Sequence, residues 1–141
     1  MIDSRTAPYG AFVLRAALGI MFVAHALLKY YVFTLPGTVQ FFEGLGLPGA
    51  LAYATFYAEL IGGALILLGL GARYVSAALI PILLGAAWAH AGNGWVFSAP
   101  NGGWEYPVFL AAAAAAVALS GNGAFALESI FRNQKPQGVT A

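Results

Sequence analysis

The chain has 141 residues, of which 61% are hydrophobic and only 8% are charged, with a formal net charge of +1. Soluble domains carry about 25% charged residues, so this chain could not cover its own surface in water, and we expect a lipid bilayer to surround it. Its few, scattered cations exclude a nucleic-acid partner. The absence of Cys excludes disulfides, thiolate metal sites and thiol redox chemistry.

Four apolar stretches, separated by Gly, Pro and Asn, predict an all-α fold: a bundle of four transmembrane helices in a single domain. The predicted helices cover residues 10–31, 50–71, 74–92 and 104–121, and a polar C-terminal tail begins at about residue 128. The first stretch resembles a signal peptide, but Arg15 interrupts it, so we expect a retained helix. The segment Thr38–Leu45 is too short and too polar to span, and we predict a small helix at the membrane interface.

The basic residues outside the predicted spans indicate an orientation. They lie in the N-terminal tail, in the turn between the second and third helices, and in the C-terminal tail: Arg5, Arg73, Arg132 and Lys135. With four spans, these segments share one side of the membrane, and the positive-inside rule places that side in the cytoplasm. The sequence therefore predicts a multi-pass protein of the cell inner (plasma) membrane with cytoplasmic N- and C-termini.

Ionisable side chains within the spans are the candidate functional residues, because each costs roughly 2.5–3.5 kcal/mol at the bilayer centre. Five converge on the outer half of the membrane: His25, Lys29, Glu59, His90 and Glu105. Arg15 continues the polar stripe of the first helix toward its inner end. We predict Glu59 and His25 as catalytic, proton-transferring residues, and Lys29, His90, Glu105 and Arg15 as substrate-binding residues around an outward-facing polar pocket.

Glu59 carries most weight because it lies roughly 13 Å from the outer end of its helix and must pair, be protonated or line a cavity. Its natural partner is Lys29 or a protonated His25, and Gly62 and Gly63 would let another helix approach that turn.

Each of the other residues also has a structural interpretation. Lys29 could reach the interface, His25 could be a hydrogen-bonded core residue, and Arg15 could bind headgroups or backbone carbonyls. His90 and Glu105 could be interfacial.

The chain resembles the DoxX family of small four-helix membrane proteins from about Arg15 to Phe125. The resemblance is carried by short motifs in this order: Arg15-Ala-Ala-Leu-Gly19, His25-xxx-Lys29, Glu59-Leu-Ile-Gly62-Gly63, Gly69-Leu-Gly71-Ala72-Arg73, His90 and Gly102-Gly103-Trp104-Glu105-Tyr106. Two positions depart from the family pattern: Ala26 stands where Gly often follows the histidine, and Ala72 where Thr often precedes the arginine. Neither departure removes a charge.

The family takes its name from a subunit of a thiosulfate:quinone oxidoreductase. The resemblance therefore implies a membrane subunit of a redox system, with a quinone as candidate ligand, no covalently bound cofactor, and a soluble or peripheral oxidoreductase subunit as candidate partner. Homo-oligomerisation is a further candidate.

Other interpretations stay open. The chain could be a membrane anchor or assembly factor, or a small-molecule or proton-coupled carrier. His25, His90, Glu59 and Glu105 could hold a divalent ion, but Lys29 disfavours a cation, so we predict no metal.

Overall fold

The computed structural model describes residues 3–133, and the regular secondary structure of this part of the chain consists of helices alone, joined by turns and loops. Its elements are α1 (Ala7–Leu27), a π-helical turn η1 (Leu28–Val32), α2 (Leu35–Gly44), α3 (Ala50–Leu68), α4 (Ala72–Ala89), a 3₁₀ turn η2 (Ala91–Asn93), α5 (Glu105–Ser120) and α6 (Leu127–Asn133). The prediction of an all-α fold is confirmed.

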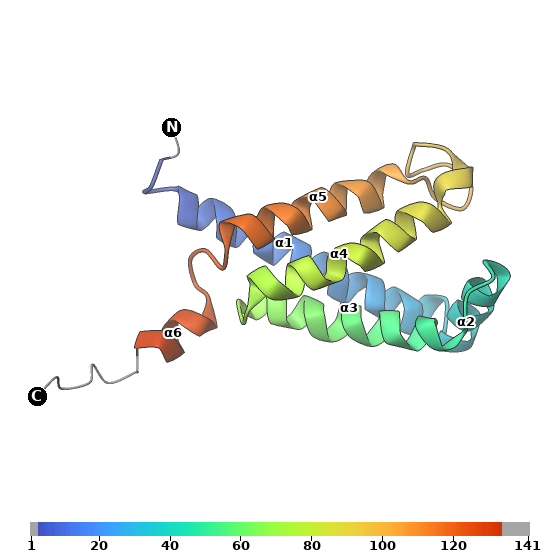
Figure 1. Ribbon diagram of the computed structural model, residues 1–141, viewed down its shortest axis with the longest axis horizontal. Coiled ribbons are helices and arrows are strands. Elements are labelled where there is room, and N and C mark those ends of the chain that lie inside the picture. Colours follow the sequence, from blue (N-terminus) through green and yellow to red (C-terminus); the bar gives the residue numbers. More distant parts are fainter. Residues whose placement is uncertain (1–2, 134–141) are drawn as a thin grey trace, which may run out of the picture.

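The four main helices α1, α3, α4 and α5 run alternately up and down (Figure 1), and each packs against two others, in the order α1–α3–α4–α5 and back to α1. Two ends of the molecule result. The terminal end holds the start of α1, the α3–α4 turn and α6. The loop end holds η1, α2 and the connection from α4 to α5.

Local sequence signals explain where these helices begin and end. Pro8 lies in the first turn of α1, where its missing N–H is not needed. Gly69 ends α3 and Gly71 precedes α4, both with positive φ, which lets α4 follow α3 after a very short turn. Thr34 caps α2 because its Oγ1 accepts a hydrogen bond from the Gly37 N–H at 3.2 Å.

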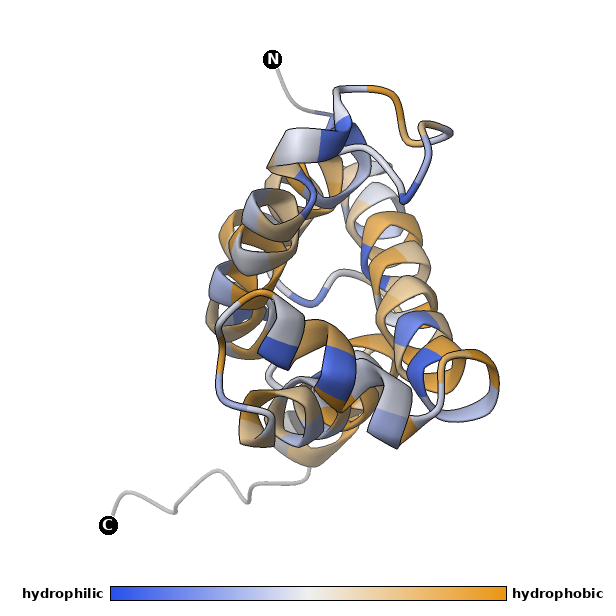
Figure 2. Cartoon of the chain, turned by 90° about the vertical axis from the view of Figure 1, so that its right-hand side faces the viewer, coloured by the Kyte–Doolittle hydropathy of each residue, from blue (hydrophilic) through white to orange (hydrophobic). Residues whose placement is uncertain are grey.

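The helices expose apolar rather than polar surface. Three are long and apolar enough to cross a membrane, namely α1 with η1, α3 and α4, and α5 is a shorter apolar helix of 16 residues. Hydrophobic residues predominate along the main helices (Figure 2), and large apolar side chains such as Leu119, which is 82% exposed, point outward. Such an apolar outer surface is typical of a protein whose solvent is lipid.

Two segments differ from the sequence-based expectation. The expected interfacial segment Thr38–Leu45 falls on α2, which begins earlier, at Leu35, and ends at Gly44. A further short helix, α6, occupies Leu127–Asn133, where we expected a polar tail to begin. The side chain of Arg132 and all of Lys135 lie outside the described residues.

Candidate functional site

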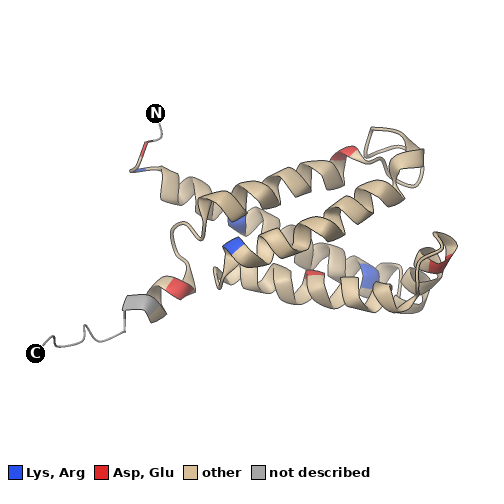
Figure 3. Ribbon diagram, in the orientation of Figure 1, with Lys and Arg blue, Asp and Glu red and all other residues tan. Residues whose placement is uncertain are grey.

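Glu59 and Lys29 form an ion pair between α3 and η1. Lys29 Nζ lies 2.7 Å from Glu59 Oε2, and the two side chains are only 17% and 8% exposed. The sequence left Lys29 and His25 open as partners of Glu59, and the structure selects Lys29. The pair is the only salt bridge between two described side chains, and charged side chains are sparse along the main helices (Figure 3). At this burial, losing either partner would leave an uncompensated charge.

Close packing of α1 against α3 brings the pair together. A Cβ on Gly63 would lie 2.8 Å from the Phe22 Cβ and 2.9 Å from the Val23 nitrogen, so only glycine allows this approach of the two backbones. Gly62 makes room in the same way for Leu79 of α4. The prediction that these two glycines admit neighbouring helices near Glu59 is confirmed.

Lys29 lies on a π-helical turn rather than on a regular α-helix. The turn closes with a hydrogen bond from the Phe33 N–H to the Leu28 carbonyl at 2.9 Å. Such turns change the direction of the side chains that follow and are frequent at functional sites. Tyr30 on the same turn stacks on Phe56 of α3, with ring centroids 6.0 Å apart. The π-helical turn therefore contacts α3 through an aromatic pair as well as through the ion pair.

His25 lies one turn before Lys29 and points to a different neighbour. Its Nδ1 donates to the Met21 carbonyl at 2.7 Å, and because a carbonyl oxygen can only accept, this bond requires a proton on Nδ1. In the neutral ring Nε2 is then a hydrogen-bond acceptor. The ring stacks on Tyr106 of α5, with centroids 5.7 Å apart. His25 thus has a fixed tautomer and orientation.

His90 lies at the loop end, where α4 ends, and its contacts are with loop and interfacial residues. Its Nδ1 lies 3.0 Å from the Asn101 carbonyl, and its ring stacks on Phe41 of α2 at 6.4 Å. Asn93 Nδ2 stabilises the same loop because it donates hydrogen bonds to the carbonyls of Asn101 and Gly102. His90 therefore connects α2 to the α4–α5 loop.

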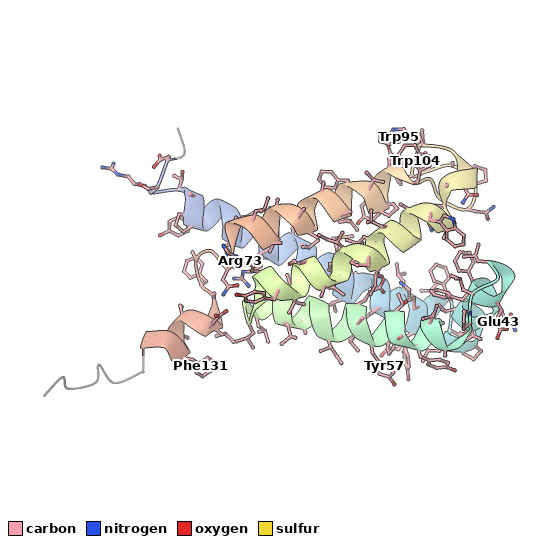
Figure 4. All side chains as sticks on the ribbon, viewed as in Figure 1. Glu43, Tyr57, Arg73, Trp95, Trp104 and Phe131 are labelled. Carbon is pink, nitrogen blue, oxygen red and sulfur yellow. The ribbon has the colours of Figure 1, made fainter. Side chains whose placement is uncertain are left out.

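Glu105 is also engaged in the loop. Its Oε1 accepts a hydrogen bond from the Phe97 N–H at 2.8 Å, and its own N–H donates to the Trp95 carbonyl. Trp95 and Trp104 pack edge to face beside it, with centroids 4.4 Å apart (Figure 4). As the first residue of α5, Glu105 places its carboxylate at the positive end of that helix.

Arg15 lies apart from the other candidates, toward the terminal end, and is fully buried. Its Nε donates to the Asn122 carbonyl at 2.8 Å, Nη1 donates to the Ile66 and Leu67 carbonyls, and Nη2 donates to the Ala124 carbonyl at 3.2 Å. Of the two interpretations left open by the sequence, the structure shows the contacts with backbone carbonyls. The guanidinium joins α1 to the end of α3 and to the turn between α5 and α6.

The structure thus unites only part of the predicted cluster. It pairs Lys29 with Glu59, places His25 one turn away, engages His90 and Glu105 in the loop, and sets Arg15 toward the other end. Within residues 3–133, no three His, Asp or Glu side chains gather as a metal site would require.

Three residues that make such contacts were not predicted from the sequence. Tyr106, which entered the sequence analysis only as the last residue of a family motif, stacks on His25; its place one residue after Glu105 was an available signal. Glu128 and Asn122 bind the start of α4 at the Gly71 and Ala72 N–H groups, at 3.1 Å each. No spacing pattern in the sequence relates these residues to α4.

An apolar helical surface and an ion pair buried between two membrane-length helices define an integral membrane protein. The family model for DoxX matches residues 10–92. Over 134 residues the chain is 34% identical to the protein named "Putative oxidoreductase CatD" of Bacillus subtilis (strain 168), covering 94% of this chain and 95% of that one. No solved structure matches the chain significantly. The chain belongs to the DoxX family.

Proposed function

We propose that this chain is a membrane subunit of a redox system and binds a quinone or a small polar substrate at the Lys29–Glu59 pair. The observation that carries the proposal is the ion pair itself, buried at 2.7 Å between two membrane helices. Intramembrane charges are costly and usually mark binding or proton-transfer sites. The name of the Bacillus subtilis relative supports an association with oxidoreductase chemistry.

The pair and His25 offer complementary hydrogen-bonding groups. An ammonium has three N–H donors, and Glu59 uses one of those of Lys29, so the others can donate to a quinone carbonyl. His25 Nε2 can accept from a quinol hydroxyl, because Nδ1 is held by the Met21 carbonyl. Glu59 would balance the positive charge of Lys29 while the bound quinone gains a proton or the bound quinol loses one. The chain carries no motif for a tightly bound cofactor, so electrons would pass between the quinone and a partner subunit or substrate.

We also propose that the chain crosses the membrane four times and that both termini lie in the cytoplasm. The fourth span is α5, whose 16 residues would stand nearly upright in the bilayer. Reporter fusions at both termini should then be cytoplasmic, and a fusion within residues 100–103 should be external. A C-terminal fusion on the external side would contradict this topology.

The test of the binding site is Glu59→Gln, which preserves volume and hydrogen bonding but removes the charge. We expect purified Glu59→Gln to fold and to lose quinone-linked activity in host membranes. Its affinity for decylubiquinone should fall at least about tenfold, because the charged hydrogen bond that holds the Lys29 ammonium at the site, worth about 1.5–3 kcal/mol, is lost. Glu43→Gln is the matched control, because Glu43 lies exposed on α2 outside the pair.

A second candidate function is a membrane anchor or assembly factor. It is favoured by one observation: Lys29 and Glu59 satisfy each other across the closely packed α1–α3 contact, as a purely structural pair would. Wild-type quinone binding and activity in a well-folded Glu59→Gln protein would favour this candidate over the first.

A further inference from the structure

A cavity of about 550 Å³ lies at the terminal end, opposite to the ion pair. It is formed by the start of α4, the end of α5, the turn that follows, and α6. Its lining is largely polar and includes the side chains of Arg73, Tyr74, Ser120, Asn122, Glu128 and Ser129. Neither the family resemblance nor the proposed quinone site accounts for this cavity.

Arg73 is the cation of the cavity. Its Nη2 donates to the Leu119 carbonyl at 3.2 Å, and within the described part of the chain it makes no ion pair. Gly121, whose φ is +84°, lies beside the guanidinium: a Cβ built there would be 3.4 Å from Nη2, an ordinary contact distance. Figure 4 shows Arg73 between the start of α4 and the segment that leads to α6. The remaining N–H donors can bind an anion in a forked geometry.

The acid of the cavity is engaged by the protein. Glu128 Oε2 accepts from the Gly71 N–H at 3.1 Å and from Asn122 Nδ2. Its carboxylate thus lies at the amide that precedes α4, where the positive end of the helix dipole offsets part of its charge. The repulsion between this carboxylate and an anion that approaches Arg73 is reduced to the same extent.

The surroundings of Arg73 identify the kind of ligand. Arg73 is the second residue of the membrane-length helix α4, so it lies at the border of the apolar region. Its neighbours Tyr74 and Leu119 are both highly exposed, and both offer apolar surface on the membrane side. A cavity that offers the donors of Arg73 at this depth, with its acid already bound to the protein, suits a lipid phosphate, with acyl chains along the neighbouring apolar side chains.

We propose that this cavity binds the phosphodiester headgroup of a lipid from the leaflet at the terminal end, with Arg73 holding the phosphate. A soluble phosphate would use the same guanidinium but would gain nothing from the apolar border. The proposal concerns a different end of the molecule from the quinone site and stands independently of it.

The experiment measures lipid binding to the purified full chain in detergent micelles doped with dioleoylphosphatidylglycerol, by native mass spectrometry and by the shift in melting temperature. Dioleoylglycerol, which has the same chains without phosphate, and inorganic phosphate are the matched ligands. Arg73→Gln removes the proposed contact, and Arg5→Gln removes a charge from an exposed residue outside the cavity.

We expect phosphatidylglycerol to bind wild type and Arg5→Gln equally, and Arg73→Gln at least about tenfold more weakly, as loss of one charged hydrogen bond implies. Arg73→Lys, which keeps the charge but not the fork, should lie between them and serves if Arg73→Gln does not fold. Equal binding by wild type and both Arg73 variants, or equal binding of dioleoylglycerol, would show an adventitious lipid only. A melting shift of the same size with millimolar inorganic phosphate would overturn the assignment to a lipid.

Discussion

The two ends of the molecule solve the problem of a buried cation differently. At the terminal end Arg15 is completely buried, has no acidic partner among the described residues and donates to four backbone carbonyls. At the loop end Lys29 pairs with a single carboxylate, remains 17% exposed and lies on a π-helical turn. In the first arrangement, the N–H donors of Arg15 bind the backbone of neighbouring segments. In the second, Lys29 keeps N–H donors that can bind a ligand. Burial alone therefore does not identify a functional charge.

The largest effect should come from breaking the Arg15 contacts. Arg15→Met keeps much of the length of the side chain but removes the guanidinium donors from the carbonyls of Leu67 and Asn122 and leaves Ile66 only its bond from the Gly69 N–H. We expect the free energy of unfolding to fall by about 4 kcal/mol. Unfolding by sodium dodecyl sulfate in mixed micelles measures it, with Val13→Ala, an exposed substitution on the same helix, as control. A loss below about 1 kcal/mol would mean that the carbonyl contacts are dispensable.

Glu59→Leu should have the next largest effect, about 3 kcal/mol, because it leaves the ammonium of Lys29 buried without a counter-charge. The double variant Glu59→Leu with Lys29→Met should recover most of that loss, since it removes both charges. The same unfolding assay tests both proteins. A double variant no more stable than the single one would show that the pair is not the source of the loss.

Packing of α1 against α3 should be sensitive to one methyl group. Gly63→Ala would place a Cβ 2.8 Å from the Phe22 Cβ, and we expect a loss of about 2 kcal/mol from the forced separation of the backbones. Gly85→Ala is the control, because a Cβ added there would meet no atom within 4 Å and alanine favours a helix. The melting temperatures of the two variants should move in opposite directions.

The smallest effect should come from the contact between α2 and the α4–α5 loop. Phe41→Ala removes the ring that stacks on His90, and we expect a cost of about 1 kcal/mol. Because the contact is peripheral, amide hydrogen exchange should quicken in α2 while α3 keeps its protection. Faster exchange throughout α3 would mean that α2 contributes to the stability of the whole molecule.

The sequence predicted the features that depend on hydrophobic length and on the cost of buried charge. The main helices follow from apolar runs between Gly and Pro. Opposite charges at similar depth predicted that Glu59 pairs with the first helix, through Lys29 or His25, and the structure selects Lys29. Side-chain direction at helix ends could not be predicted in this way. Glu105 was expected either at the polar pocket or at the interface, and its carboxylate accepts a hydrogen bond from the Phe97 N–H of the loop.

Two further features were beyond sequence reasoning for a different reason. The π-helical turn at Lys29 has no periodicity signal, since it differs from an α-helix by a single residue. The helix α6 is only seven residues long, and its Glu128 binds Gly71 and Asn122. Contacts of this range depend on how the helices pack, which local patterns do not encode.

The contacts of Arg15 also impose an order on the assembly of the chain during translation. Its carbonyl partners lie 51, 52, 107 and 109 residues later in the sequence. At roughly 5–20 residues per second, the ribosome needs several seconds to deliver them after α1 has emerged. Throughout that interval the guanidinium of α1 must find temporary hydrogen-bond acceptors in water, headgroups or the translocation machinery. In a nascent chain that stops before Asn122, some N–H donors of Arg15 would lack their native acceptors. Such a chain would be a substrate for membrane quality control.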